Sequence, residues 1–134
     1  MQRSKKMILA AATVAVAQLA FPGRTKAAVF TWDGGGADDN LSTIANWNPD
    51  GSPVAADSVI FTGAVRNTPV VDSARQYTNI SFTGSNAFTI GTVGTTNAIT
   101  VGVTPTFAGI IRNTSAVSQE YSGPVNMFNG TVAA

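Results

Sequence analysis

"SVIFTG" at residues 58–63 and "NISFTG" at residues 79–84 are two copies of one pattern, set twenty-one residues apart. In the second copy polar residues alternate with large apolar ones, the first copy differs at that face by carrying Ile60 where the second has Ser81, and a Gly ends each run. Alternation with a period of two is typical of a β-strand that buries one face. Matching strands at a short spacing indicate a chain that coils and stacks each strand on an earlier one.

The rest of the chain after Val29 has the same character. "NAFTIG" at 86–91 recurs eleven residues later as "NAITVG" at 97–102, and further short β-branched runs are bounded by Gly, Asn, Pro, Asp or Ser. No long amphipathic helix is predicted. "NLSTIANW" at 40–47 could form one helical turn, with Ser42 or Asp39 as its cap. We therefore predict an all-β fold, a short β-solenoid with an irregular N-terminal cap.

In such a solenoid each turn buries a row of apolar side chains, and Asn and Gly suit the corners because they tolerate positive φ. If one turn takes about 20 residues, the chain after Val29 makes about five turns. An antiparallel β-sandwich remains the alternative, since it also consists of short, evenly spaced strands. The residues expected to point inward are Val59, Phe61, Ile80, Phe82, Phe88, Ile90, Ile99, Val101, Ile110 and Val125.

Residues 1–27 have the composition of a signal peptide. A basic stretch, "MQRSKK", precedes fifteen residues, "MILAAATVAVAQLAF", which are apolar apart from one Gln and too short to span a bilayer comfortably. Thr25 and Ala27 are the small residues that a signal peptidase reads, so cleavage is expected before Ala28. We predict a leader helix and an exported product that meets a membrane only during export. An uncleaved anchor stays open because Arg24 and Lys26 lie near the cut.

The composition excludes several classes of function. The chain has no Cys and no His, which removes disulfides, thiolate nucleophiles and imidazole bases. After residue 28 three Arg stand against six Asp and one Glu. That part is acidic and has no basic patch, so a nucleic-acid partner is not expected. We predict that the protein is not an enzyme and has no catalytic residues.

Residues 30–63, "FTWDGGGADDNLSTIANWNPDGSPVAADSVIFTG", contain a Trp, a Gly/Asp-rich loop, an Asn-Trp pair, a Pro and an Asp-x-x-x-Phe strand. This order resembles the N-terminal segment of bacterial surface proteins built from autotransporter-associated β-strand repeats. "GIIRNTSAVSQEYSGPV" at 109–125 is similar to their repeat. Leu41 stands where members tend to carry a third Trp.

The resemblance implies a right-handed β-helix that is secreted or displayed on the bacterial envelope. On this basis residues 28–56 form an N-terminal Trp/Gly/Asp cap, and residues 57–134 form a β-strand repeat region that is truncated relative to the family. Partners would be polysaccharide or other cell-surface components. Self-association through an open strand edge is also expected, because unpaired strands invite further pairing.

The loop "DGGGADDN" at 33–40 allows two interpretations. Asp33, Asp38, Asp39 and Asn40 are closely spaced oxygen ligands of the kind that suit Ca²⁺. The alternative is a turn in which Gly supplies backbone freedom and Asp and Asn bind nearby backbone groups. We favour the turn, with no cofactor, and keep Ca²⁺ as the second possibility.

Trp32 and Trp47, the two tryptophans of the chain, also allow two interpretations. They could stack on sugar rings, or they could cover the apolar end of the coil, which is the role we favour. The leading hypothesis is therefore an exported, non-enzymatic surface segment, structural or adhesive. A carbohydrate-binding module using both Trp, and a fragment of a Ca²⁺-dependent polysaccharide lyase, are the alternatives.

Overall fold

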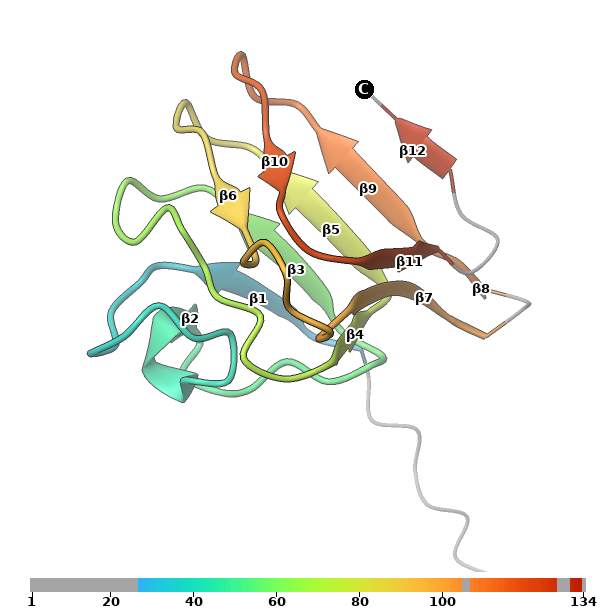
Figure 1. The fold of residues 1–134 in the computed structure, drawn as a ribbon, viewed down its shortest axis with the longest axis horizontal. Coiled ribbons are helices and arrows are strands. Elements are labelled where there is room, and N and C mark those ends of the chain that lie inside the picture. The colour runs from blue at the N-terminus through green and yellow to red at the C-terminus, as the bar shows by residue number, and fades with distance from the viewer. Residues whose placement is uncertain (1–26, 105–106, 128–130, 134) are drawn as a thin grey trace, which may run out of the picture.

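The computed structural model describes residues 27–104, 107–127 and 131–133. This part of the chain is built from short strands and a single turn of 3-10 helix, η1 (Figure 1). The elements are β1 (Val29–Trp32), η1 (Ile44–Asn46), β2 (Trp47–Asn48), β3 (Ser58–Phe61), β4 (Arg75–Tyr77), β5 (Asn79–Phe82), β6 (Thr89–Ile90), β7 (Ile99–Thr104), β8 (Phe107–Ala108), β9 (Ile110–Asn113), β10 (Glu120–Tyr121), β11 (Val125–Met127) and β12 (Thr131–Ala133).

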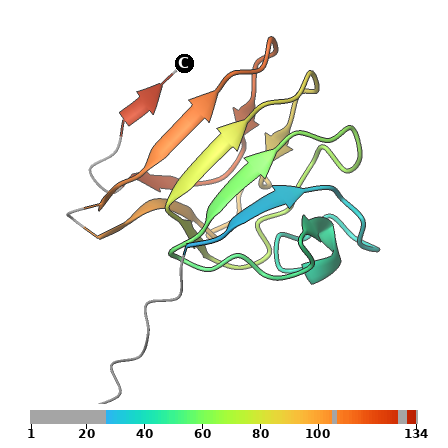
Figure 2. The ribbon, with the colours of Figure 1, turned by 180° about the vertical axis from the view of Figure 1, so that it is seen from behind.

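The largest sheet stacks one strand from each turn of the chain. β1, β3, β5, β9 and β12 lie side by side in that order and are all parallel, as Figure 2 shows from behind. The two copies of the opening pattern are direct neighbours, with Ser58 opposite Asn79 and Phe61 opposite Phe82. The twenty-one-residue repeat is therefore one turn of a coil.

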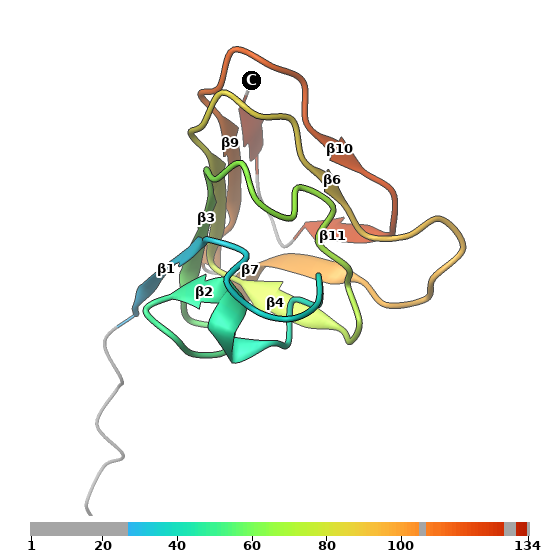
Figure 3. The same ribbon diagram turned by 90° about the vertical axis from the view of Figure 1, so that its left-hand side faces the viewer.

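Two smaller sets of strands close the coil into three sides (Figure 3). β4, β7 and β11 form a parallel sheet, and β6 pairs in parallel with β10. A parallel bridge between Asn40 and Val70 belongs to the earlier turns of the β6–β10 side. Seen from its first turn in Figure 3, the chain runs clockwise as it recedes, so the coil is right-handed. β8 folds back on β7 in an antiparallel pair outside this pattern.

The predicted β-solenoid is thus confirmed, and the antiparallel sandwich is wrong. The turn length of about 20 residues fits two of the four turns and is too short for the other two. From one strand of the large sheet to the next the chain advances 29, 21, 31 and 21 residues, because some corners carry longer loops. Five stacked strands are separated by four advances, and because the first of these contains the irregular η1–β2 segment, the described chain makes roughly three regular turns rather than five.

The interior contains most of the residues predicted to point inward. Phe61 and Phe82 stack between successive turns, and Phe88 packs tilted against both, with ring centroids 5.4 Å to 6.2 Å apart. Val125 is partly buried against this core. The fully buried members of the predicted set are Val59, Phe61, Ile80, Phe82, Phe88, Ile90, Ile99 and Val101.

Ile110 is the prediction that fails. It is 38% exposed, and its neighbour Ile111 is buried instead, with 9% exposure. The register explains this result, because Ile111 lies opposite the inward Ile80 and Ile110 lies opposite Asn79. A doublet of identical apolar residues cannot reveal from its own pattern which member faces the core.

The two copies of the eleven-residue repeat do not pair with each other in the structure. They contribute to β6 and β7, which lie on different sides of the coil and pair with other strands. Similar strand sequences occur here because each side needs alternating apolar residues, and not because these two strands are neighbours.

Asparagine serves the corners in a way that differs from the prediction. Among the described residues, Arg66 is the one non-glycine residue at positive φ, 53°. Asn instead bonds one turn to another: Asn86 Nδ2 donates to the carbonyl of Gly63 at 3.1 Å, and Asn97 Nδ2 donates to that of Val71 at 3.1 Å. Asn is useful at the corners because its side-chain amide donates hydrogen bonds to the backbone of a neighbouring turn.

The N-terminal part of the described chain is the least regular. β1 forms the first strand of the large sheet, and β2 returns to pair with it in antiparallel fashion. In Figure 3 η1 and β2 lie in front of the coil, at the end where it begins. The predicted leader helix falls on residues 1–26, outside the described residues. Within the described part, no helix has the length and apolarity needed to cross a membrane.

Candidate functional site

The structure places Trp32 and Trp47 inside the first turn. Each side chain has 0% exposure, and their rings meet edge to face with centroids 5.1 Å apart. Both indole N–H groups are bonded: Trp32 Nε1 donates to the carbonyl of Arg66 at 3.1 Å, and Trp47 Nε1 to that of Leu41 at 3.0 Å. The sugar-stacking face that the sequence suggested is therefore not formed, because both rings pack in the core.

Asn46 organises the Gly/Asp-rich loop. It is fully buried, and its Oδ1 accepts from the backbone N–H of Gly36 at 2.9 Å. Its Nδ2 donates to the carbonyls of Asp38 and Asn40, both at 3.0 Å. A Cβ on Gly36 would lie 2.6 Å from Asn46 Oδ1, so this glycine is needed for the close approach. The loop is a turn wound around one amide side chain.

The acids of this loop also bond within the protein. Asp33 Oδ1 accepts from the N–H of Gly35 at 3.0 Å. Asp38 Oδ1 accepts from the Thr43 hydroxyl at 2.6 Å and from the Asn40 N–H at 3.1 Å. These are the side-chain-to-backbone bonds of a structured turn.

Asp39 is held by a residue distant in sequence. Arg66 Nη1 lies 2.9 Å from Asp39 Oδ1, and Arg66 Nε donates to the carbonyl of Gly34 at 3.1 Å. Arg66 therefore joins the loop to the next turn of the coil. A bound cation would have to displace this guanidinium, which disfavours a Ca²⁺ site at Asp39.

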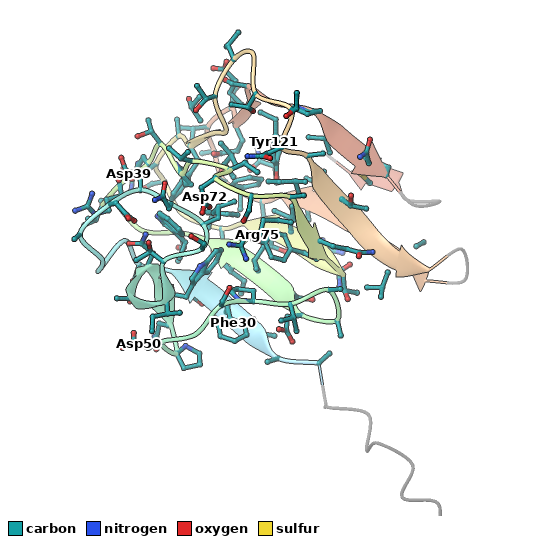
Figure 4. All side chains as sticks on the ribbon, turned by 60° about the horizontal axis from the view of Figure 1, so that its bottom comes forward. Phe30, Asp39, Asp50, Asp72, Arg75 and Tyr121 are labelled. Atoms are coloured by element: carbon teal, nitrogen blue, oxygen red, sulfur yellow. The ribbon has the colours of Figure 1, made fainter. Side chains whose placement is uncertain are left out.

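The predicted calcium ligands do not converge into a metal centre. Within the described residues no three acidic side chains lie close enough together to hold a metal ion. In Figure 4 Asp50 lies apart from Asp39, on the side of the molecule where Phe30 is labelled. Of the two interpretations of "DGGGADDN", the geometry favours the turn.

Asp38 gives this loop a pH dependence. Hydrogen bonds from Thr43 and Asn40 hold the pKa of Asp38 below its ordinary value of 3.8. Because the pKa of Asp38 is lower in the folded state, its ionised carboxylate stabilises the folded protein at pH values above 3.8. That stabilisation is lost as the pH falls through the folded-state pKa of Asp38. We expect the difference in unfolding midpoint between wild type and Asp38→Asn to shrink as the pH falls from about 6 to about 2. An NMR titration that places the Asp38 carboxyl at or above 3.8 would contradict this.

A groove that the sequence did not predict lies on the outer face of the large sheet. It is shallow, has a volume of about 310 Å³, and crosses β1, β3, β5 and β9, the strands seen face-on in Figure 2. Its lining combines apolar residues, small polar residues and one cation. These are Val29, Ser58, Val59, Ile60, Asn79, Ser81, Ile110 and Arg112.

The polar side chains of this groove form part of a ladder. Asn79 Nδ2 donates to the Ser58 hydroxyl at 3.2 Å, and Asn79 Oδ1 accepts from the N–H of Ile110 at 3.2 Å. Arg112, at the far side, is exposed. The sequence pattern shows which residues of each strand face outward. Only the parallel register of the strands shows that these outward residues lie in one row.

Two tyrosines pack in or against the core and do not line this groove: Tyr77 is fully buried and Tyr121 is partly buried. Burial raises the pKa of both Tyr77 and Tyr121 well above the ordinary value of 10.0. The ring of Tyr77 lies against Trp47, and that of Tyr121 against Phe82, with centroids 6.4 Å and 6.0 Å apart. Both phenols therefore stay neutral at ordinary pH, and both rings serve the core.

Comparison with known proteins does not assign this chain to a family. No protein-family model, no curated protein and no solved structure matches this chain.

Proposed function

We propose that this protein is an exported, non-enzymatic β-solenoid segment of a bacterial cell surface, with weak adhesive contacts to polysaccharide. The similarity of residues 30–63 to autotransporter-associated β-strand repeat proteins supports a place on the envelope. The basic and apolar pattern of residues 1–27 supports export.

The use of the side chains supports a structural role. Within the described residues, aromatic side chains make up much of the core, and the acids of the first loop bond to backbone groups, to Thr43 or to Arg66. Arg75 lies 3.9 Å from Asp72, in a second internal ion pair. The acids of the first loop, together with Arg66, Asp72 and Arg75, are thus engaged in bonds within the protein, which is typical of a scaffold.

The outer groove is the surface that best suits an adhesive contact. Hydroxyl and amide groups of Ser58, Asn79 and Ser81 can exchange hydrogen bonds with sugar hydroxyls. Ile110, which is exposed, offers an apolar patch for the face of a sugar ring. Arg112 adds a cation that suits the carboxylate of a uronic acid. The observation that carries this proposal is the alignment of these groups across three neighbouring parallel strands, β3, β5 and β9.

The test combines location and binding. The full chain, expressed with its own leader in a Gram-negative host, should be recovered outside the cytoplasm. The same material should be retarded in native gels that contain polygalacturonate, with an affinity near the millimolar range, about −4 kcal/mol. Arg112→Ser should reduce the retardation several-fold, whereas Glu120→Gln, a charge change on β10, should not.

The two halves of the proposal fail separately. Recovery of the chain in the cytoplasm would contradict export. Equal mobility with and without polygalacturonate, or equal retardation of wild type and Arg112→Ser, would contradict the adhesive groove.

A further inference from the structure

Asp57 is a buried carboxylate at the entrance to β3. The residue is 6% exposed, and its Oδ2 accepts from the backbone N–H of Val54 at 2.9 Å. Its Oδ1 accepts from the backbone nitrogen of Ala28 at 2.8 Å. Among the described residues, the ion pairs use Asp39 and Asp72 and leave Asp57 without a cationic side chain. Carboxylates this deeply buried are normally paired with a cation.

Ala28 is fixed in place on its other side as well. Its carbonyl accepts from the N–H of Ser58 at 2.9 Å, and β1 begins at the next residue, with Val29 opposite Ser58. Ala28 is half-buried, whereas Ala27 is exposed. The chain therefore enters the coil at Ala28, whose nitrogen is directed at the Asp57 carboxylate.

The predicted cleavage site falls on the bond that precedes this nitrogen. Thr25 and Ala27 occupy the positions that a signal peptidase reads, so the enzyme would cut between Ala27 and Ala28. Hydrolysis adds water across that peptide bond. Ala27 leaves as a carboxylate on the leader, and the Ala28 nitrogen becomes an amine that takes up a proton as an ammonium group.

We propose that leader removal creates an ion pair between the new α-ammonium of Ala28 and the buried carboxylate of Asp57, and that this pair stabilises the first turn of the processed protein. The inference rests on the proposed export for the origin of the amine. Before cleavage the Ala28 nitrogen is a neutral amide donor, and after cleavage it is a charged one. A hydrogen bond in which both the donor and the acceptor are charged is shorter and stronger than one in which the donor is neutral.

The expected effect follows from that difference. Exchanging a neutral donor for a charged one at a buried carboxylate lowers the unfolding equilibrium constant about tenfold. The gain belongs to this one contact, since the other partners of Asp57 are backbone groups of Val54 and Thr78. An N-terminal extension of any sequence would forfeit it.

The composition makes the test unusually direct. The three Lys residues, Lys5, Lys6 and Lys26, all precede Ala28, so the α-amine is the sole amino group of the processed chain. The full chain carries the substitutions Arg24→Ile, Thr25→Glu, Lys26→Gly and Ala27→Arg, which allow factor Xa to release Ala28. Denaturant unfolding is measured before and after cleavage. A second portion of the cleaved chain is acetylated while unfolded and then refolded.

Cleavage should lower the unfolding equilibrium constant about tenfold, and acetylation, which keeps one N–H but removes the charge, should reverse the gain. In Asp57→Asn the cleaved and uncleaved chains should be equally stable. The rate of amine acetylation supplies a readout that needs no comparison of stabilities. It should be at least tenfold slower in the folded cleaved chain than in denaturant. If Asp57→Asn does not fold, the stability of the acetylated wild-type chain and the acetylation rate of its folded form still test the ion pair.

Equal stability of the cleaved, uncleaved and acetylated chains would overturn the ion pair. N-terminal sequencing of exported material is the separate check on its origin, and a first residue other than Ala28 would overturn the role of processing. A chain that stays uncleaved in the cytoplasm would instead count against the proposed export, because the factor Xa experiment does not depend on secretion.

Discussion

Replacing Asn46 by alanine is expected to lower the free energy of unfolding by about 4 kcal/mol. The substitution leaves the N–H of Gly36 and the carbonyls of Asp38 and Asn40 without their side-chain partner, in a site where Asn46 is fully buried. Each unsatisfied buried group costs about 1–3 kcal/mol. Because Trp47 is the next residue and is buried, its fluorescence during denaturant unfolding provides the measurement.

Two further variants make this result specific. Asn48→Ala, two residues away on an exposed side chain, should change the free energy of unfolding by less than about 0.5 kcal/mol. Asn46→Asp keeps the acceptor for Gly36 but replaces the donor by an oxygen that faces two carbonyls, so it should be at least as damaging as alanine. If Asn46→Ala behaved like Asn48→Ala, the loop would not depend on this amide.

Phe61→Ala is expected to cost about 4–5 kcal/mol, the upper part of the range for deleting a buried aromatic ring. Phe61 joins the cap to the regular turns. Its ring centroid lies 5.8 Å from that of Trp47 and 5.4 Å from those of both Phe82 and Phe88. Since a domain of this kind is stable by about 5–15 kcal/mol, the variant should retain little stability. Thermal and denaturant unfolding followed by circular dichroism provide the measurement.

The neighbouring residue serves as the control. Ile60 lies on the same strand but points into the outer groove and is half-buried, so Ile60→Ala should cost about 1 kcal/mol. Phe61→Leu, which keeps most of the apolar volume, should fall between the two alanine variants. Equal losses for Phe61→Ala and Ile60→Ala would show that the aromatic stack does not hold the turns together.

These residues also show how much can be learned from sequence here. The inward side of β5 was predictable, because period-two alternation fixes the two faces of a strand, and that of β3 followed from its match to β5. Their pairing was predictable as well, because a repeat encodes the same local structure twice. Ile110 was not predictable, because the neighbouring β5 determines which of two adjacent Ile residues meets the core.

The candidate sites were harder still. Closely spaced acids in a Gly-rich loop suggest a metal site. The sequence does not reveal that Arg66 pairs with Asp39, because the two residues are 27 positions apart in the chain. The direction of Trp47 depends on β2 pairing with β1 in antiparallel fashion, which Asn46 permits by fastening the loop. The contact between Ala28 and Asp57 spans 29 residues.

The sequence by itself determined that this protein is all-β and built from short strands, and its repeats favoured a coil over a sandwich, since strand patterns and repeats are local features. Only the tertiary structure decided which aromatic rings are buried, which acids are occupied, and which outward residues line one groove. Those outcomes depend on contacts between turns. The corner loops differ in length, so that one turn takes 21 to 31 residues, and this length sets which residues meet.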